Sequence, residues 1–254
     1  MSKRSGPPRQ EMTLLEHLVE LRTRLVRSML ALLVGILVGI VLTRPFLELL
    51  ISPLGENRPQ SLKPAENILV YFKVDLILGL ILAMPVIVYQ FFAFINPGLE
   101  EKERRYVLGI SAAAAFLFAL GVSFASLVML PFTLKYLQSF LSDLITPSYS
   151  IDYYIAFVTN FVFYVGMSFE LPLVMAALAR LGIISPQQLG KQRRYAIVII
   201  AIIAAVITPT PDPFNMTLVM LPLLALYELG IILARLTYRP RPSQTTDQPV
   251  ATSQ

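Results

Sequence analysis

The sequence predicts an all-α membrane protein with six transmembrane helices, and three observations support this prediction. Hydrophobic residues make up 56% of the 254 residues, charged residues only 15%, and the mean hydropathy is +0.67. Soluble domains carry charge on about a quarter of their residues, so this chain is too apolar for that class. The apolar residues are also gathered into long runs, separated by short polar segments, as in a chain that crosses a bilayer several times.

Six apolar runs are expected to become the spans. The first four can cross a hydrocarbon core of about 30 Å at 1.5 Å per residue, whereas the last two are short and should form a shallow hairpin. Pro85 and Pro222 should kink their helices, which favours a curved bundle with a concave face. The runs cover residues 28–43, 68–95, 106–131, 151–179, 195–209 and 215–234.

The polar segments before and after the runs complete the predicted organisation. Residues 1–27 are expected to be a cytoplasmic amphipathic segment, with a helix from Thr13 that lies along the membrane surface. Residues 28–235 form the six-helix domain, and residues 236–254 lack apolar periodicity and should be disordered. The first segment has no cleavable signal or transit peptide, which favours a bacterial inner membrane.

Basic residues indicate the orientation. Sixteen of the 21 Lys and Arg residues lie in or beside residues 1–27, 96–105, 180–194 and the C-terminal end. Because Lys and Arg mark the cytoplasmic side, the N and C termini should both be cytoplasmic. The opposite loops, 44–67 and 132–150, carry apolar residues and are expected to pack as a cap over the outer face.

Composition also excludes several functions. The chain has no cysteine and a single histidine, His17, so it predicts no disulfide, metal site or thiolate nucleophile. No glycine-rich phosphate-binding segment is present, and we expect no cofactor and no catalytic residue. The net charge of +5 is explained by basic residues that flank spans, so nucleic-acid binding is not expected.

A polar stretch at 96–105 places Glu100, Glu101 and Glu103 between two spans. Two interpretations remain open. The carboxylates can simply favour the N-terminal end of the third helix through its dipole. Alternatively, they accept a guanidinium through paired, charge-assisted hydrogen bonds and so bind a peptide with arginine followed by hydrophobic residues. The apolar shelf beside them would be formed by Phe91, Phe92, Phe94 and Ile95. A second carboxylate, Glu20, lies one helical turn before Arg24 and on its own predicts an ordinary exposed ion pair.

Glu170 is the most informative single residue, because it lies inside the fourth apolar run. A carboxylate at that depth costs at least ~2.5–3.5 kcal/mol, so it should face protein, water or a partner. Pro172 frees the carbonyl of Ser168 and predicts a bent polar notch. The alternative is a hydrogen bond to a neighbouring helix. Glu228, in the last apolar run, is a second carboxylate of this kind, but weaker evidence for a buried contact because it lies nearer the cytoplasmic boundary.

Four segments together resemble the TatC family, the core membrane subunit of the twin-arginine (Sec-independent) protein translocase. The resemblance extends from His17 to Arg235. It rests on His17–Leu25, Phe94–Arg105, Phe169–Pro172 and Thr208–Asp212.

The resemblance implies a glove-like six-helix receptor, not an enzyme, that binds the Arg-Arg signal peptides of folded cargo. It also implies recruitment of single-span TatA- and TatB-type partners, export driven by the proton-motive force, contact with membrane lipids, and a homo-oligomer within the complex. Met216 stands where many members have glutamine, with Asn215 as the alternative polar residue. Signal-peptide binding is implied for Glu20, Arg22, Arg24, Phe94, Pro97, Leu99, Glu103, Arg104 and Arg105. Intramembrane contact with the signal hairpin or partners is implied for Glu170, Pro172, Met216 and Glu228, and Pro53 and Asp212 correspond to the outer cap and the final turn.

Two rival functions can be weighed against this one. A proton-coupled small-solute transporter would also use an intramembrane carboxylate, but it predicts internal repeats and a polar midplane cavity, and the sequence shows no repeat. An intramembrane hydrolase needs a Ser–His or paired-aspartate site, yet the spans contain no histidine and only Asp75 near an interior. The transporter is kept as the alternative.

Overall fold

The structure, a computed structural model, describes residues 14–55, 57–95, 101–144, 148–208, 210 and 212–238, with the backbone alone at 14, 95 and 101–107. The described residues are helical apart from connections and one isolated bridge between Gln60 and Ser150, so the all-α class is confirmed. The elements are α1 (Leu14–Ile51), η1 (Ser52–Leu54), α2 (Glu66–Ile95), α3 (Glu101–Phe124), η2 (Ala125–Met129), α4 (Leu130–Ser139), α5 (Ile151–Ser168), α6 (Leu171–Arg180), α7 (Pro186–Lys191), α8 (Arg193–Ile207) and α9 (Pro213–Thr237).

Five segments of the described chain are long and apolar enough to cross a membrane. The sixth candidate, α8, has 15 residues and is about 22 Å long, short of a hydrocarbon core. The fifth apolar run is therefore a short helix, as expected, but the expectation of a short last helix is wrong. α9 has 25 residues, because Asp212 caps its N-terminus and the helix continues to Thr237 past the apolar run. The five segments are Leu15–Leu54, Glu66–Phe94, Leu108–Ser139, Ile151–Arg180 and Pro213–Thr237.

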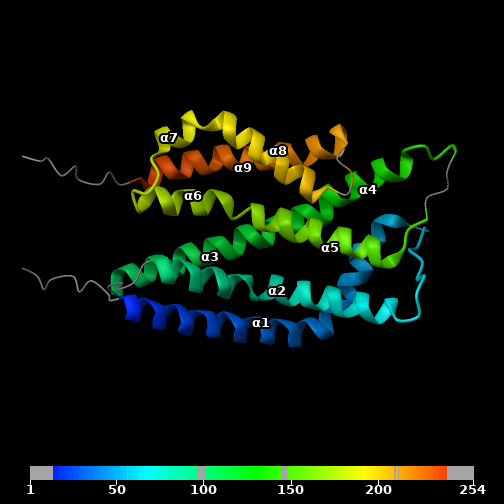
Figure 1. The fold of residues 1–254 in the computed structure, drawn as a ribbon, viewed down its shortest axis with the longest axis horizontal. Helices are drawn as coiled ribbons and strands as arrows, with labels where there is room; N and C mark the ends of the chain where they lie inside the picture. The colour runs from blue at the N-terminus through cyan, green and yellow to red at the C-terminus, as the bar shows by residue number, and fades with distance from the viewer. Residues whose placement is uncertain are drawn as a thin grey trace, which may run out of the picture.

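The first and third spans extend further than their apolar runs. α1 runs without a break through Arg27 and lies beside α2, so residues 14–27 continue the span and do not form a separate surface helix (Figure 1). The third span continues through the π-helical turn η2 into α4. Pro131 lacks the N–H that would bond to Leu127, and a π turn accommodates such a gap.

The expected outer cap is therefore smaller than the loops at 44–67 and 132–150. Leu54, the last residue of η1, is buried, as expected of a cap residue, whereas Phe140, Leu141 and Leu144 are exposed after the end of α4. The packing predicted for those three side chains is wrong, because α4 carries the chain beyond the helices they would cover. Ile145 lies outside the described residues.

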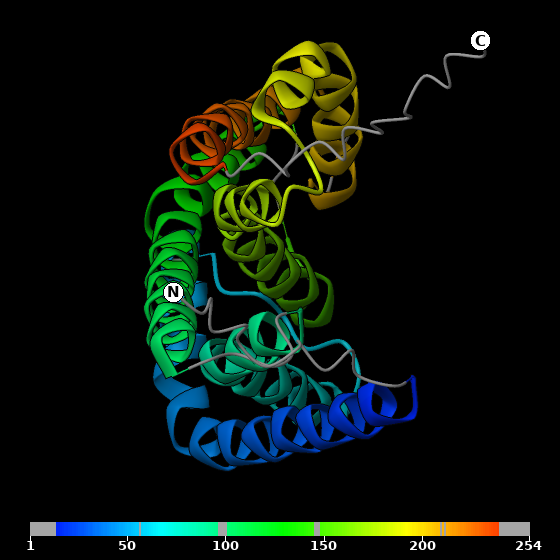
Figure 2. The same ribbon diagram turned by 90° about the vertical axis from the view of Figure 1, so that its left-hand side faces the viewer.

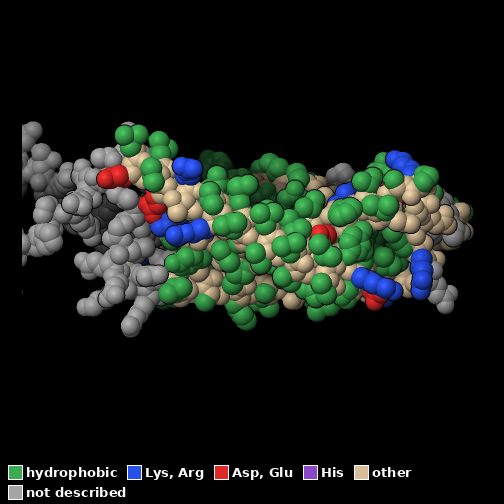
Figure 3. Space-filling model, turned by 90° about the horizontal axis from the view of Figure 1, so that it is seen from below, with side chains coloured by type: hydrophobic (Ala, Val, Ile, Leu, Met, Phe, Trp, Pro, Cys, Tyr) green, Lys and Arg blue, Asp and Glu red, His purple; other side chains and the backbone are tan. Residues whose placement is uncertain are grey.

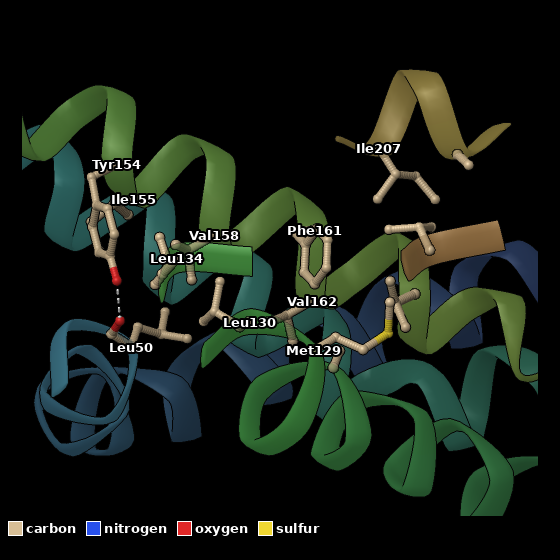
Figure 4. Packing of buried hydrophobic residues seen from close by; sticks show 14 of the residues in the cluster. Leu50, Met129, Leu130, Leu134, Tyr154, Ile155, Val158, Phe161, Val162 and Ile207 are labelled. Atoms are coloured by element: carbon tan, nitrogen blue, oxygen red, sulfur yellow. Dashed lines mark hydrogen bonds between the residues drawn. The ribbon is translucent and has the colours of Figure 1, made fainter. Parts of the chain in front are cut away.

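α5 is the central helix of the bundle. It packs against α2 and α3 on one side and against α8 on another, and Figure 2 shows the other helices arranged around it along an open arc. Its side chains at Ile155, Val158, Phe161 and Val162 are fully buried (Figure 4). The hydroxyl of Tyr154 donates to the carbonyl of Leu50, 2.6 Å away, and joins α5 to the end of α1. The face seen in Figure 3 is largely apolar, with Lys and Arg side chains toward both ends.

Helices α1 and α2 approach closely at two glycines. A Cβ added to Gly79 would lie 2.6 Å from Cγ1 and 2.8 Å from the backbone nitrogen of Ile36. A Cβ on Gly35 would collide with the carbonyl of Gly79. Small residues at such contacts let helices pack by van der Waals attraction in lipid, where the hydrophobic effect between helices is absent.

Replacing Gly79 tests this contact. Gly79→Ala should push α1 from α2 and lower the free energy of unfolding by about 1 to 3 kcal/mol, measured by thermal unfolding in detergent. Gly109→Ala is the control, because a Cβ at Gly109 meets nothing within 4 Å and alanine favours helix. Equal stability of the two variants would contradict the packing account.

Candidate functional site

The described helices place two sets of polar residues at opposite ends of the bundle (Figure 1). The termini end is where α1 begins, α2 ends, α3 begins and α9 ends. The cap end holds η1, the segment 57–66, and the turns after α4 and before α9.

At the termini end, Glu20 and Arg24 form the ion pair that their spacing predicts. Nε of Arg24 donates to Oε1 of Glu20 over 2.8 Å, and its Nη2 contacts the same oxygen. Nη1 of Arg24 also donates to Oε1 of Gln90 on α2, 3.4 Å away. The side chains of Arg24 and Glu20 are only 19% and 16% exposed, so the pair is better shielded than an ordinary surface pair.

This arrangement leaves an acceptor unused. Oε2 of Glu20 is buried and has no hydrogen-bond partner among the described residues. Sequence reasoning missed Gln90, although a glutamine within an apolar run was the signal for it. Because Gln90 and Arg24 hold the carboxylate from one side, its second oxygen is oriented in advance toward a further donor.

An aromatic wall lies beside this carboxylate. The ring of His17 stacks on that of Phe94 with centroids 4.4 Å apart and an interplanar angle of 24°. Phe94 is half-buried at the end of α2, Phe91 is exposed and Phe92 is buried, so the predicted apolar shelf is only partly turned outward. The structure thus brings His17, Glu20, Arg24 and Phe94 to one end.

Within the described residues, the structure does not bring the remaining residues of the predicted peptide site together with these four. Arg22 is exposed on α1 and is not part of the ion pair. Glu103, Arg104 and Arg105 lie in the first turns of α3, of which the structure describes only the backbone. Pro97 and Leu99 lie outside the described residues.

Glu170 lies where the fourth span breaks between α5 and α6. The amides of Phe169 and Glu170 bond to carbonyls three residues back, at 3.1 and 3.0 Å, and α6 begins directly before Pro172. Glu170 is only 7% exposed, yet neither carboxylate oxygen has a partner among the described residues. The helix break and a buried carboxylate are therefore present, and the alternative of a hydrogen bond to a neighbouring helix has no described partner.

Two other predicted contact residues are already engaged within the chain. Oε2 of Glu228 pairs with Nη2 of Arg193 at 2.7 Å, with both side chains half exposed. Met216 packs against the central core. Asn215 is fully buried, and its Nδ2 donates to Oδ2 of Asp212 over 2.8 Å, so it does not present an outward polar group in place of Met216.

Asp212 is the N-cap of α9, and Pro53 lies in η1 at the same cap end. The Asp212 carboxylate accepts from the amides of Phe214 and Asn215, at 3.1 and 2.9 Å, and from the Thr210 hydroxyl at 2.6 Å. Burial on its own would raise the pKa of Asp212, but the hydrogen bonds from Thr210, Asn215 and Phe214 outweigh it and hold the pKa below its ordinary value.

A carboxylate that sequence reasoning overlooked ties the cap together. Buried Glu66, the first residue of α2, accepts from the amides of Leu62 and Lys63 through Oε2 and from Ser150 and Asp152 through Oε1. Its place in the first turn after a polar loop was the available signal. Nζ of Lys73 also reaches Oδ1 of Asp152 at 2.6 Å. In the described part of the chain, no cluster of three His, Cys, Asp or Glu side chains could hold a metal.

The fold, the unpartnered carboxylates and the five apolar spans define a multi-pass membrane protein. Residues 16–222 match the family model described as Sec-independent protein translocase protein (TatC). The Deinococcus radiodurans TatC is 40% identical over 241 residues, covering 92% of this chain and 89% of its own. The Aquifex aeolicus TatC is 39% identical over 236 residues, covering 91% and 98%.

A solved structure agrees with these matches. The crystal structure of the twin arginine translocase receptor TatC superposes with a TM-score of 0.78 at 39% identity and covers 88% of this chain and 100% of that one. The chain therefore belongs to the TatC family of Sec-independent protein translocase proteins. The resemblance seen in the four short segments is confirmed, and the small-solute transporter finds no support in these relatives.

The cap of α9 gives a prediction with a pH dependence. Asp212→Ala should lower the free energy of unfolding by about 0.5–2 kcal/mol at pH 7, and Asp212→Asn should keep most of it, because asparagine also caps helices. Since the folded-state pKa of Asp212 is lowered, its contribution is present above about pH 4 and is lost as pH falls through the folded pKa.

The measurement is thermal unfolding in detergent between pH 7 and pH 3. As pH falls, the free energy of unfolding of Asp212→Asn should decrease less than that of the wild type, because asparagine has no carboxylate to protonate. Asp143→Ala, at an exposed residue of the same end, is the control. An identical pH profile for wild type and Asp212→Asn would refute the cap as the source.

Proposed function

We propose that this chain is the receptor and scaffold subunit of a twin-arginine translocase. It binds the Arg-Arg signal peptides of folded proteins at the termini end and recruits TatA- and TatB-type subunits for export driven by the proton-motive force. The observation that carries the proposal is the unpartnered Oε2 of Glu20, held beside the aromatic wall of Phe94. Membership of the TatC family supports it.

Recognition follows from the chemistry of guanidinium and carboxylate groups. One arginine of the signal donates to the free oxygen of Glu20, which Arg24 and Gln90 hold in place, so little conformational entropy is lost on binding. Glu103 in the first turns of α3 accepts the second arginine. Hydrophobic residues that follow the arginines pack against Phe94.

The neighbouring residues shape this acceptor. Pro97 and Leu99, between α2 and α3 in the sequence, are proposed to belong to the same signal-peptide site. The basic side chains at Arg22, Arg104 and Arg105 limit the negative charge of the site, and so favour a pair of arginines over a longer basic tract.

Within the membrane, Glu170 is the proposed contact for the signal hairpin or for the single helices of partners. A buried carboxylate without a partner is costly, and a hydroxyl or amide donor from an arriving helix relieves that cost. Pro172 keeps the notch open, because it prevents α5 and α6 from joining into one regular helix. Met216 and Glu228 extend the contact along α9.

The proposed orientation places the termini end in the cytoplasm of a bacterial cell and the cap end outside. The concentration of Lys and Arg at the termini end supports this orientation. In it, α8 is a short crossing, the fifth of six in chain order, and several copies of the chain assemble in one complex. The subunit acts by binding and positioning, without a bond-making active site.

The peptide site can be tested by charge removal. Glu20→Gln and Glu103→Gln should each weaken binding of a twin-arginine peptide by roughly ten- to hundredfold, because each removes a charge-assisted hydrogen bond. Peptide affinity of the purified protein is the measurement. Glu16→Gln, which removes an exposed carboxylate one turn earlier on α1, is the control and should bind normally.

Two further comparisons decide the outcome. A peptide with Lys-Lys in place of Arg-Arg should bind weakly to wild type and be little affected by the substitutions, since lysine lacks the planar fork. If Glu103→Gln reduces the amount of protein in the membrane as much as it reduces peptide binding, the carboxylate has only the helix-dipole role.

Glu170 needs a separate test. Glu170→Gln conserves size and should weaken co-purification with TatA- or TatB-type partners, while twin-arginine peptide affinity stays unchanged. Ser168→Ala, a polar deletion in the adjacent turn whose hydroxyl bonds only within its own helix, is the control. Unchanged partner assembly and transport in Glu170→Gln would show that the charge is dispensable.

A further inference from the structure

The cap end carries a pocket that signal recognition at the opposite end does not use. Its volume is about 420 Å³, within the range of small-molecule sites. The last turn of α1 and η1 form one wall, and Arg58 and Pro59 form another as the chain returns toward α2. Ile151, the first residue of α5, closes the inner side.

The walls of this pocket are held by contacts elsewhere in the fold. On the α1 side, Leu50 and Leu54 are buried, and the Leu50 carbonyl receives the Tyr154 hydroxyl. On the other side, the amide of Gln60 donates to Tyr149 over 2.8 Å, and that of Ile151 donates to Gln60 over 2.9 Å. The pocket is therefore formed before any ligand arrives.

Two side chains of opposite charge line the pocket, and neither is held by a strong contact within the described chain. Arg58 is exposed and has no ion pair or hydrogen-bond partner among the described residues. Glu48 pairs only loosely with Arg44, at 3.5 Å, with side chains that are 71% and 86% exposed. Such a pair contributes little and is easily exchanged for another cation. The pocket thus offers a ligand the guanidinium of Arg58, which has no described partner, and the carboxylate of Glu48, which is only weakly paired.

The pocket lies at the end of a helix that is long and apolar enough to cross a membrane. Leu15–Leu54 is a candidate span, and its last residues line the pocket. The outward face of α1 that leads to it is apolar and exposed, for example at Val41 and Leu49. A molecule bound here therefore has a polar site at the headgroup level and an apolar helix surface directly below it.

We propose that this pocket binds the headgroup of an aminophospholipid. The phosphate lies on the Arg58 guanidinium, the ammonium group lies on the Glu48 carboxylate, and the acyl chains follow the apolar face of α1. Arginine matches the phosphate geometry, and an ammonium group donates hydrogen bonds to Glu48. A choline headgroup has no N–H to donate, and a glycerol headgroup has no cation for Glu48.

The test is native mass spectrometry of the full chain in detergent with equal amounts of phosphatidylethanolamine, phosphatidylcholine and phosphatidylglycerol of the same acyl composition. Wild type should retain phosphatidylethanolamine about fivefold more than either other lipid. Arg58→Gln should lower retention of this lipid, and Glu48→Gln should remove its advantage over phosphatidylcholine. Lys63→Gln is the control, because it removes an exposed cation of the same segment that does not line the pocket.

Each outcome decides the proposal. Equal retention of the three lipids by wild type, or equal loss in Lys63→Gln and Arg58→Gln, overturns it. A preference for phosphatidylglycerol that depends on Arg58 alone overturns the role of Glu48.

Free phosphoethanolamine at the lipid concentration should not displace the lipid. Displacement would show that the pocket binds the headgroup without the acyl chains, and would overturn the lipid as the source. Both substituted side chains are exposed, and Arg58→Lys, which keeps the charge, should retain part of the binding.

Discussion

The burial of α5 is the constraint on which the rest of the bundle depends. Fully buried side chains on this helix contact α2 and α3 on one side and α8 on another, so the position of each neighbour follows from α5. Its first turn is fixed to the cap by the bonds of Glu66 and by Tyr154, and its last turn ends at the break before α6. One buried helix thus connects the cap end with the break at Glu170.

The buried and partly buried carboxylates of this membrane protein differ in their bonding. Two stabilise the fold through several hydrogen bonds: Glu66 accepts four, and Asp212 caps α9. Two that are proposed to recognise a ligand keep acceptors without a described partner, namely Oε2 of Glu20 and both oxygens of Glu170. Since an unsatisfied buried carboxylate is costly, its persistence is most simply explained by a donor supplied from outside the chain.

The two ends of the molecule then have different tasks. At the termini end, one shielded ion pair orients a carboxylate without consuming it. At the cap end, backbone bonds between residues 60 and 149–151 and the Glu66 carboxylate hold the loops, and the charged side chains of Arg58 and Glu48 remain exposed. When hydrogen bonds already hold the backbone in place, charged side chains on it can bind a ligand with little loss of conformational entropy.

The sequence by itself determined the class, the number of apolar runs, the Glu20–Arg24 pair and the unusual depth of Glu170, because all of these depend on local spacing and on the cost of charge in lipid. It also carried the family motifs. Only the tertiary structure decided that Gln90 from another helix completes the pair, that Asn215 turns inward to Asp212, and that Glu66 joins loops far apart in the chain. It also decided that α4 and α9 extend past their apolar runs. These features depend on contacts between distant segments and on the caps of individual helices, which hydrophobic periodicity does not encode.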